Sequence, residues 1–209
     1  MHFFKKRIGY ILILIITCVF FVGCKNTNNN VISNSASEEI ITKEQEDYLN
    51  NGYQIGDYKL LLTKNQKKNE KQTFIDNNFF EVNFLKIQDN IDLSKKINII
   101  LYGLHYSPEE ERYTLGTFLI NTTNTTIKKL SFTLTPSFKN IGDVEPIKSN
   151  FEGDDLVELP PKSFFTLAIY GDAPLKSADL LMENKGPDIT FKITDLEING
   201  EKVDNTNEH

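Results

Sequence analysis

The sequence predicts a mainly β protein in which two antiparallel sheets pack as a sandwich. Several segments alternate apolar and polar residues, which is the period of a strand with one buried face, and the clearest are Leu130–Thr135 and Ile189–Thr194. These segments are short and are separated by clusters of Asn, Gly, Pro and Asp. No long stretch with a helical period lies between them, so the pattern does not favour a parallel α/β sheet.

The first element is a basic start followed by an apolar run. Lys5, Lys6 and Arg7 precede residues 8–22, a run of 15 residues, whereas a membrane-spanning helix needs about 20. A positive start, an apolar region of this length and a small residue behind it are the parts of a secretory signal peptide. The excess of positive charge before the run places the rest of the chain outside the cytoplasm.

The end of this run resembles the lipobox of bacterial lipoproteins. Phe21-Val22-Gly23-Cys24 places a small residue and a cysteine directly behind the apolar region, with Phe21 where the family usually has Leu. The resemblance implies cleavage between Gly23 and Cys24 and a diacylglyceryl anchor on Cys24, so that the membrane is the first expected partner. Two acyl chains suffice for stable anchoring. The alternative is an uncleaved N-terminal anchor beside an ordinary cysteine.

Cleavage would leave an acidic chain without a disulfide. Cys18 would leave with residues 1–23, which also hold three of the 23 Lys and Arg but none of the 29 Asp and Glu. The remaining 20 positive and 29 negative side chains give a net charge of −9, which disfavours binding to nucleic acid. The many Asn, Ile and Lys residues are typical of a low-GC Gram-positive bacterium, so we expect the outer face of its cell membrane as the location.

Residues 24–40 are polar and predict a flexible tether. Residues 41–56 predict a short helix and lead-in, because Thr42 and Gln45 have capping-box spacing and Asn51-Gly52 follows. Residues 57–200 predict the sandwich, and the polar tail at residues 201–209 is expected to be disordered.

Seven or eight strands and one or two short helices are expected. The expected strands are Tyr58–Thr63 at an edge, Phe79–Ile87, Ile97–Leu104 and Tyr113–Asn121 as central strands, Leu130–Thr135, Leu156–Leu159, Phe165–Ile169 and Ile189–Thr194. Lys64, Lys67, Lys68 and Lys71 would lie in a solvated hairpin loop. A second helix is expected at Ala178–Lys185, with Ser177 as its cap and Gly186-Pro187 as its stop.

Two segments resemble small immunoglobulin-like domains of Firmicute extracellular proteins and lipoproteins. They are the strand, Asn-Thr turn and strand at residues 116–132 and the proline turn Leu159–Ser163. The resemblance implies an immunoglobulin-like sandwich with a binding or spacer role, and it supplies no catalytic residue.

The motifs of common enzymes are absent from the sequence. Only His105 and His209 follow Cys24, and no G-x-S-x-G, phosphate-binding glycine loop or Cys/His cluster occurs. We therefore expect no enzyme, cofactor or metal. Acidic loops at Glu109–Glu111 and at residues 152–155 make calcium a conceivable ligand, but the EF-hand pattern is absent and solvated loop charges that keep the chain soluble are the favoured explanation. A glycosidase is disfavoured because the chain lacks Trp.

Four tyrosines, Tyr102, Tyr106, Tyr113 and Tyr170, fall on or beside the expected central strands. An exposed row of them would form a binding face, although such residues also line sheet edges or cores. The leading hypothesis is a lipid-anchored, non-enzymatic envelope protein that binds a protein, peptide or wall component, or serves as a spacer. The alternatives are an immunity protein that sequesters a toxic peptide and a hydrolase that uses acidic residues.

Overall fold

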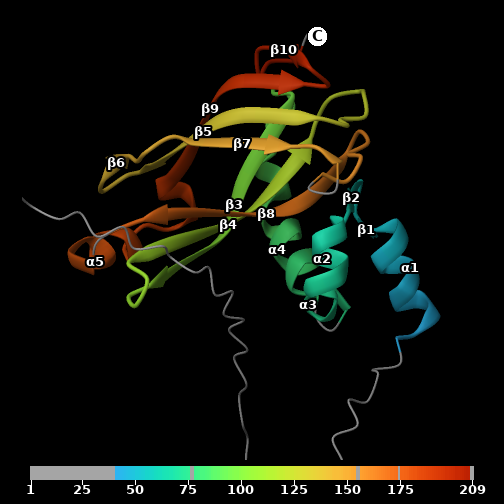
Figure 1. Ribbon diagram of the computed structural model, residues 1–209, viewed down its shortest axis with the longest axis horizontal. Helices are drawn as coiled ribbons and strands as arrows, with labels where there is room; N and C mark the ends of the chain where they lie inside the picture. The colour runs from blue at the N-terminus through green and yellow to red at the C-terminus, as the bar shows by residue number, and fades with distance from the viewer. Residues whose placement is uncertain (1–40, 76–77, 154–155, 174, 208–209) are drawn as a thin grey trace, which may run out of the picture. The chain divides into compact units, whose positions relative to one another are not determined.

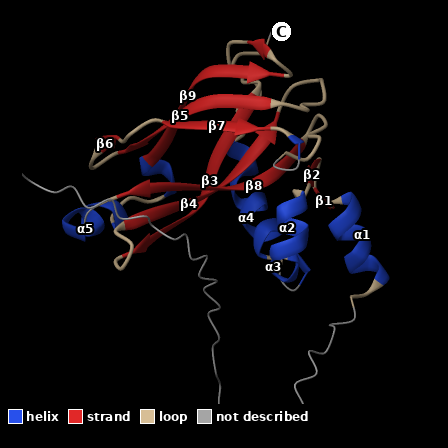
Figure 2. Ribbon diagram, viewed as in Figure 1, coloured by secondary structure: helices blue, strands red, loops and turns tan. Residues whose placement is uncertain are grey.

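The computed structural model describes residues 41–75, 78–153, 156–173 and 175–207. Strands predominate in this part of the chain, and short helices accompany them (Figure 2). The prediction of a mainly β protein with two sheets is confirmed. The expected signal peptide, the Gly23-Cys24 cleavage point and the tether at residues 24–40 lie outside the described residues.

Five strands form the first sheet, sheet 1, in the order β1-β2-β8-β4-β3. The long strands β3 (Ile97–Ser107), β4 (Arg112–Asn121) and β8 (Ser163–Asp172) are antiparallel neighbours. The short strands β1 (Tyr53–Ile55) and β2 (Tyr58–Leu60) form a hairpin, and β2 pairs in parallel with the start of β8. Strand β3 therefore lies at one edge of sheet 1.

Sheet 2 is organised around β5 (Leu130–Phe138). Strand β9 (Ile189–Ile198) pairs along one side of β5, while β6 (Gly142–Asp143) and β7 (Ile147–Phe151) pair along the other. The two-residue strand β10 (Glu201–Lys202) pairs with the end of β9. Figure 1 shows β5, β7 and β9 lying across β3, β4 and β8.

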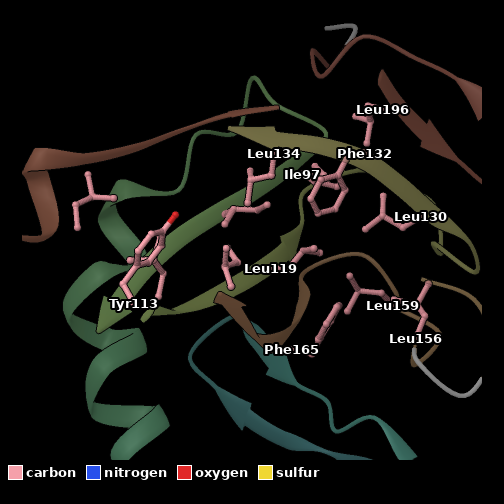
Figure 3. Packing of buried hydrophobic residues seen from close by; sticks show 14 of the residues in the cluster. Ile97, Tyr113, Leu119, Leu130, Phe132, Leu134, Leu156, Leu159, Phe165 and Leu196 are labelled. Carbon is pink, nitrogen blue, oxygen red and sulfur yellow. The ribbon is translucent and has the colours of Figure 1, made fainter. Parts of the chain in front are cut away.

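Alternate residues of the long strands point between the sheets and form the sandwich core. Leu119 of β4 and Leu134 of β5 both belong to it, and Figure 3 shows them between the two sheets, with Tyr113 toward the left of the view. The alternation that predicted these strands therefore has the expected cause, a buried face on each sheet. The buried members include Ile97, Tyr106, Tyr113, Leu115, Leu119, Leu130, Phe132, Leu134, Phe138, Leu156, Leu159, Phe165, Ile169, Ile189 and Leu196.

The other face of sheet 1 is covered by helices and carries a second cluster, the outer core. Its buried members are Ile55, Leu60, Phe80, Phe84, Phe118, Ile120 and Phe164. Helix α4 (Phe79–Ile87) lays Phe84 against Phe164, with ring centroids 4.0 Å apart and planes 8° apart. The layers are thus sheet 2, sheet 1 and helices, in that order.

Three more helices precede α4 in the chain. Helices α1 (Lys43–Asn51) and α2 (Lys64–Asn69) both begin with capping boxes, Thr42 with Gln45 and Thr63 with Gln66. Helix α3 (Lys71–Ile75) follows α2 directly. The amide of Gln66 also donates to the backbone oxygen and hydroxyl of Thr166 at 3.1 and 2.7 Å, which fixes α2 to β8.

The helix expected at residues 42–52 is confirmed, but two other expectations for this region are wrong. Residues 79–87 form α4 and not a strand, because Phe80, Phe84 and Ile87 have the helical i, i+4, i+7 spacing and face sheet 1. The lysine-rich segment forms α2, which Thr63 caps, and the start of α3 at Lys71, and not a hairpin loop. Helices are therefore more numerous than the one or two expected.

Several boundaries and positions also differ from expectation. Strand β2 is not at the edge, since β1 lies outside it, and β3, expected to be central, is at the edge. Residues 156–159 contribute only a bridge from Leu159 to Ile127. Helix α5 (Ala178–Met182) is shorter than expected, and Ser177 makes no side-chain cap. The short 3-10 turn Gly186–Asp188 follows it.

The polar tail is ordered as far as Asn207, contrary to the expected disorder. The side-chain amide of Asn207 donates to the backbone oxygens of Leu93, Lys95 and Thr122 at 2.6–3.2 Å. Asn205 makes similar contacts with Ile97. Polar composition alone predicted a free tail, whereas these asparagines satisfy backbone groups at the edge of sheet 1.

The Asn-Thr turn after β4 depends on one buried side chain. Asn121 is fully buried and donates to the backbone oxygens of Thr125 and Leu159 at 2.9 and 2.8 Å. Its side-chain oxygen accepts from the backbone N–H of Thr123 at 2.9 Å. All its hydrogen-bonding groups are therefore used, and the turn is joined to the proline segment.

Candidate functional site

The four tyrosines do not form one face. Tyr106 and Tyr113 lie opposite each other in β3 and β4 and are buried in the sandwich core, where the Tyr106 hydroxyl donates to the backbone oxygen of Ala173 at 3.0 Å. Tyr102 and Tyr170 belong to the opposite face of sheet 1, because their neighbours on that face are Gly116 and Thr114. The expectation of one exposed row is wrong. A β-bulge between Leu101 and Gly103 puts Tyr102 on the face opposite to Tyr106. In β8 the residue opposite Tyr113 is Gly171, so its neighbour Tyr170 points to the other face.

His105 lies within β3, opposite Thr114, and is exposed. The acidic loops are used in ion pairs and turns: Glu110 lies 3.7 Å from Arg112, and Glu152 lies 3.6 Å from Lys129. Among the described residues no group of three or more His, Cys, Asp or Glu side chains is arranged to hold a metal ion. Asp154 and Asp155 of the second loop lie outside those residues.

An apolar pocket lies in the helical layer. The pocket has a volume of about 180 Å³ and lies between α1, the β1-β2 hairpin, α3 and α4. Its lining residues are Tyr48, Leu49, Tyr53, Leu60, Leu62, Phe74, Ile75, Asn78, Phe80 and Glu81. Leu49, Leu60, Leu62 and Phe80 are buried, so most of the wall is fixed by packing.

The polar part of this pocket comes from Tyr48, Tyr53, Asn78 and Glu81. The Tyr53 hydroxyl donates to Glu81 at 2.9 Å, and the Tyr48 hydroxyl donates to Glu44 at 2.7 Å. The two rings meet edge to face, with centroids 5.0 Å apart. Each hydrogen bond to a carboxylate raises the pKa of its tyrosine, because it stabilises the protonated phenol, and desolvation adds to the effect.

The pocket is large enough for a small ligand group. Apolar cavities of about 150 Å³ hold a ring-sized molecule, so this pocket has room for an aromatic ring or a branched side chain. Glu81 offers an acceptor beside it. Glu70 is the one carboxyl among the described residues whose pKa is raised, and desolvation is the cause. The described residues thus offer no pair of carboxyls with raised pKa values.

Reasoning from the sequence missed this pocket because its walls come from segments assigned to a strand and a loop. One local signal was present, since Thr63 and Gln66 repeat the capping-box spacing of Thr42 and Gln45. Had helices been predicted to begin at residues 64 and 79, a helical layer beside the β1-β2 hairpin could have been expected. The long-range contacts that close the pocket have no sequence signal.

Comparison with known proteins gives no relative. No protein family, no curated protein and no solved structure matches the chain. Within the part of the chain that the structure describes, every helix is too short or too polar to cross a membrane.

Proposed function

We propose that this protein is a lipid-anchored, non-enzymatic binding protein on the outer face of the cell membrane of a Gram-positive bacterium. The observation that carries the proposal is Cys24 directly behind Gly23 and a short apolar run with a basic start. A diacylglyceryl group there would hold the domain at the membrane without basic residues. After cleavage the net charge is −9, so anionic headgroups would repel the domain. The lipid anchor would therefore be needed to hold it at the membrane.

We also propose that the sandwich is immunoglobulin-like. Its main strands, in chain order, are β3, β4, β5, β7, β8, β9 and β10. Strands β3, β4 and β8, which are the first, second and fifth, form the main part of sheet 1. Strands β5, β7, β9 and β10, which are the third, fourth, sixth and seventh, lie in sheet 2. Constant-type immunoglobulin domains differ in having the fourth strand on the other sheet. Such a sandwich presents its loops and edges for binding.

The pocket beside Tyr53 is the proposed small-ligand site. Its apolar wall and the acceptor oxygens of Glu81 suit a ring or branched side chain that carries one donor, such as an indole N–H. Nuclear magnetic resonance of the full-length protein with added indole tests this: we expect shifts at Leu49 and Phe80. Absence of any shift there at millimolar indole would remove the pocket as a ligand site.

The anchor is tested by expressing the full-length protein in a Gram-positive host with an alkyne fatty acid. We expect the protein to take up label, to lose residues 1–23 and to enter the membrane fraction, whereas Cys24→Ala does none of these. Cys18→Ala is the matched control, because the resemblance assigns Cys18 no role, and it should be labelled normally. Unlabelled wild-type protein that keeps its N-terminus would show that the lipoprotein assignment is wrong.

An exposed apolar stripe supports a second candidate, sequestration of a cationic amphipathic peptide. Phe79, Val82 and Leu85 of α4 are 46%, 38% and 44% exposed, an unusual set on one helix face. Glu81 lies on the same helix. If this is the function, cells that carry the protein should survive such a peptide, and Val82→Lys should abolish protection. Leu175→Lys, at an exposed leucine outside α4, should not.

A further inference from the structure

The edge of sheet 1 at β3 carries hydrogen-bonding groups that point away from its partner strand. At Ile97 both outward groups are bonded: its N–H donates to the Asn205 side-chain oxygen at 2.9 Å, and its carbonyl accepts from the Asn205 amide at 3.2 Å. Because outward groups recur at every second residue of an antiparallel strand, those of Ile99 and Leu101 point the same way. No described residue is bonded to them on that side.

The facing edge of β9 is open over most of its length. Strand β10 pairs only with Glu197 and Ile198, and the backbone N–H of Val203 bonds to Leu196. The described chain then crosses to β3, where Asn205 and Asn207 are bonded. In the proposed immunoglobulin-like order the last strand runs along the whole of β9. On the side of β9 that faces away from β5, the described residues place no strand beside residues 189–194.

A cleft of about 580 Å³ lies between these two edges. Its apolar wall comes from Ile97, Ile99 and Leu101 on one side and Ile189, Phe191 and Ile193 on the other. The two charged side chains that line it, Asp92 and Lys95, are 3.5 Å apart and neutralise each other. The wall therefore carries no net charge and would reject a charged segment, because burying an unpaired charge is unfavourable.

We propose that this cleft receives an extended, uncharged peptide strand from a partner protein, which pairs with the outward backbone groups of Ile99 and Leu101. Strand addition to an open edge is a common mode of peptide recognition. Residues 97–104 contain no charged residue and no proline, the features that protect an edge strand from pairing. Asn205 already makes at Ile97 the two bonds that a strand residue would make.

A second copy of this chain fits the edge less well. Two β3 strands paired about Ile99 would place Leu101 of one copy opposite Ile97 of the other, whose outward groups are already bonded to Asn205. The groups needed at that position are therefore taken. The proposal rests on the proposed function in one respect only: the lipid anchor would decide that the partner is met outside the membrane. The cleft itself does not depend on the anchor.

The test uses full-length protein and a fluorescent peptide of sequence Thr-Ile-Thr-Val-Thr-Ile-Thr. We expect saturable binding by anisotropy and about tenfold slower amide exchange at Ile99 and Leu101 when the peptide is bound. The amide of Ile100 should change little, because it faces β4. Peptides N-methylated at every second residue keep their side chains but lose alternate N–H groups, and one of the two registers should not bind.

Leu101→Lys should reduce affinity at least about tenfold, because it places an unpaired charge in the cleft. Leu93→Lys is the matched control: it adds the same charge at a nearby side chain that is 64% exposed, and it should bind normally. Thermal unfolding of both variants shows that they fold. If Leu101→Lys itself fails to fold, the N-methylated peptides and the exchange data on wild-type protein decide.

Absence of peptide binding, or binding that neither N-methylation nor Leu101→Lys weakens, would overturn the proposal. A dimer in sedimentation that protects Ile99 and Leu101 without peptide would also overturn it, because the occupant would then be a second copy. Labelling of Cys24 is measured separately, so a failure here leaves the anchor standing. A failed anchor likewise leaves this cleft to be judged on the peptide data.

Discussion

Phe164 and Phe165 are neighbours in β8, yet they belong to different cores. Phe164 stacks on Phe84 of α4 in the outer core, whereas Phe165 lies in the sandwich core beside Phe151 of β7, with ring centroids 6.0 Å apart. Sheet 1 is thus buried on both faces where β4 and β8 run side by side. One sheet holds the second sheet on one face and the helices on the other.

The two cores are built from different side chains. The outer core contains four phenylalanines among its seven buried members, whereas the sandwich core is mainly Leu and Ile. Helix α4 has only nine residues, about two and a half turns, and large flat rings bury much area from so few positions. The helices are therefore an integral layer of the fold, and the comparison of the two faces can be tested residue by residue.

The largest expected effect comes from truncating these two rings in turn. Phe164→Ala and Phe165→Ala should each lower the free energy of unfolding by about 3–5 kcal/mol, since both side chains are almost completely buried. Chemical denaturation measures this. Amide exchange should then separate them: Phe164→Ala speeds exchange in α4, and Phe165→Ala speeds it in β5 and β7. Faster exchange in the same elements for both would mean that the two cores are not distinct.

A smaller effect is expected where a tyrosine ring lies over a glycine on each face. A Cβ at Gly171 would come within 2.2 Å of the Tyr113 ring in the sandwich core, and one at Gly116 within 2.6 Å of the Tyr102 ring on the outer face. Gly171→Ala should cost about 1–3 kcal/mol, because Tyr113 is buried and cannot move aside. Gly116→Ala should cost less, because Tyr102 is only partly buried.

Gly103→Ala is the control for this pair, measured by thermal unfolding. A Cβ there meets no atom within 4 Å, and its stability should stay within about 0.5 kcal/mol of wild type. If Gly171→Ala and Gly116→Ala lowered the free energy of unfolding equally, the expected difference between the two faces of sheet 1 would be contradicted.

The capping box of α2 can be compared with that of α1. Gln66 is buried and also bonds Thr166, whereas Gln45 is only half-buried and its capping bonds are to Thr42. Gln66→Ala should cost about 1–3 kcal/mol, because it leaves buried groups unpaired. Gln45→Ala should cost about 0.5 kcal/mol. Urea unfolding of the two variants measures the difference, and similar costs would contradict a fixed contact between α2 and sheet 1.

The smallest effect near neutral pH is expected from two phenols, that of buried Tyr113 and that of partly buried Tyr102. Burial raises the pKa of Tyr113 and of Tyr102 to about 12 from 10. Between pH 10 and 12 the unfolded chain loses these protons before the folded chain does, so stability falls as pH rises through this window and is unaffected below it. Tyr113→Phe or Tyr102→Phe should flatten the decline in unfolding free energy, and an unchanged decline in both would contradict the burial.

Local patterns predicted much of the sandwich. Alternation in Leu130–Thr135 and Ile189–Thr194 predicted β5 and β9, and the Thr42 capping box predicted α1, because period and capping are short-range. The apolar run at residues 79–87 was misassigned, since a short run without clear alternation fits a buried strand or a helix equally. No pattern within β3 showed that it lies at an edge. Edge position depends on which strands pair with it.

The candidate sites divide in the same way. The basic, apolar and cysteine pattern that ends at Cys24, and the acidic charge of the residues after it, can be read from the printed chain, because both are properties of composition and order. The folded arrangement was needed to show that Tyr106 and Tyr113 are core residues, that Tyr53 meets Glu81, and that the edges of β3 and β9 border one cleft. Those facts join residues up to about a hundred positions apart, and packing between sheets and helices sets which of them meet.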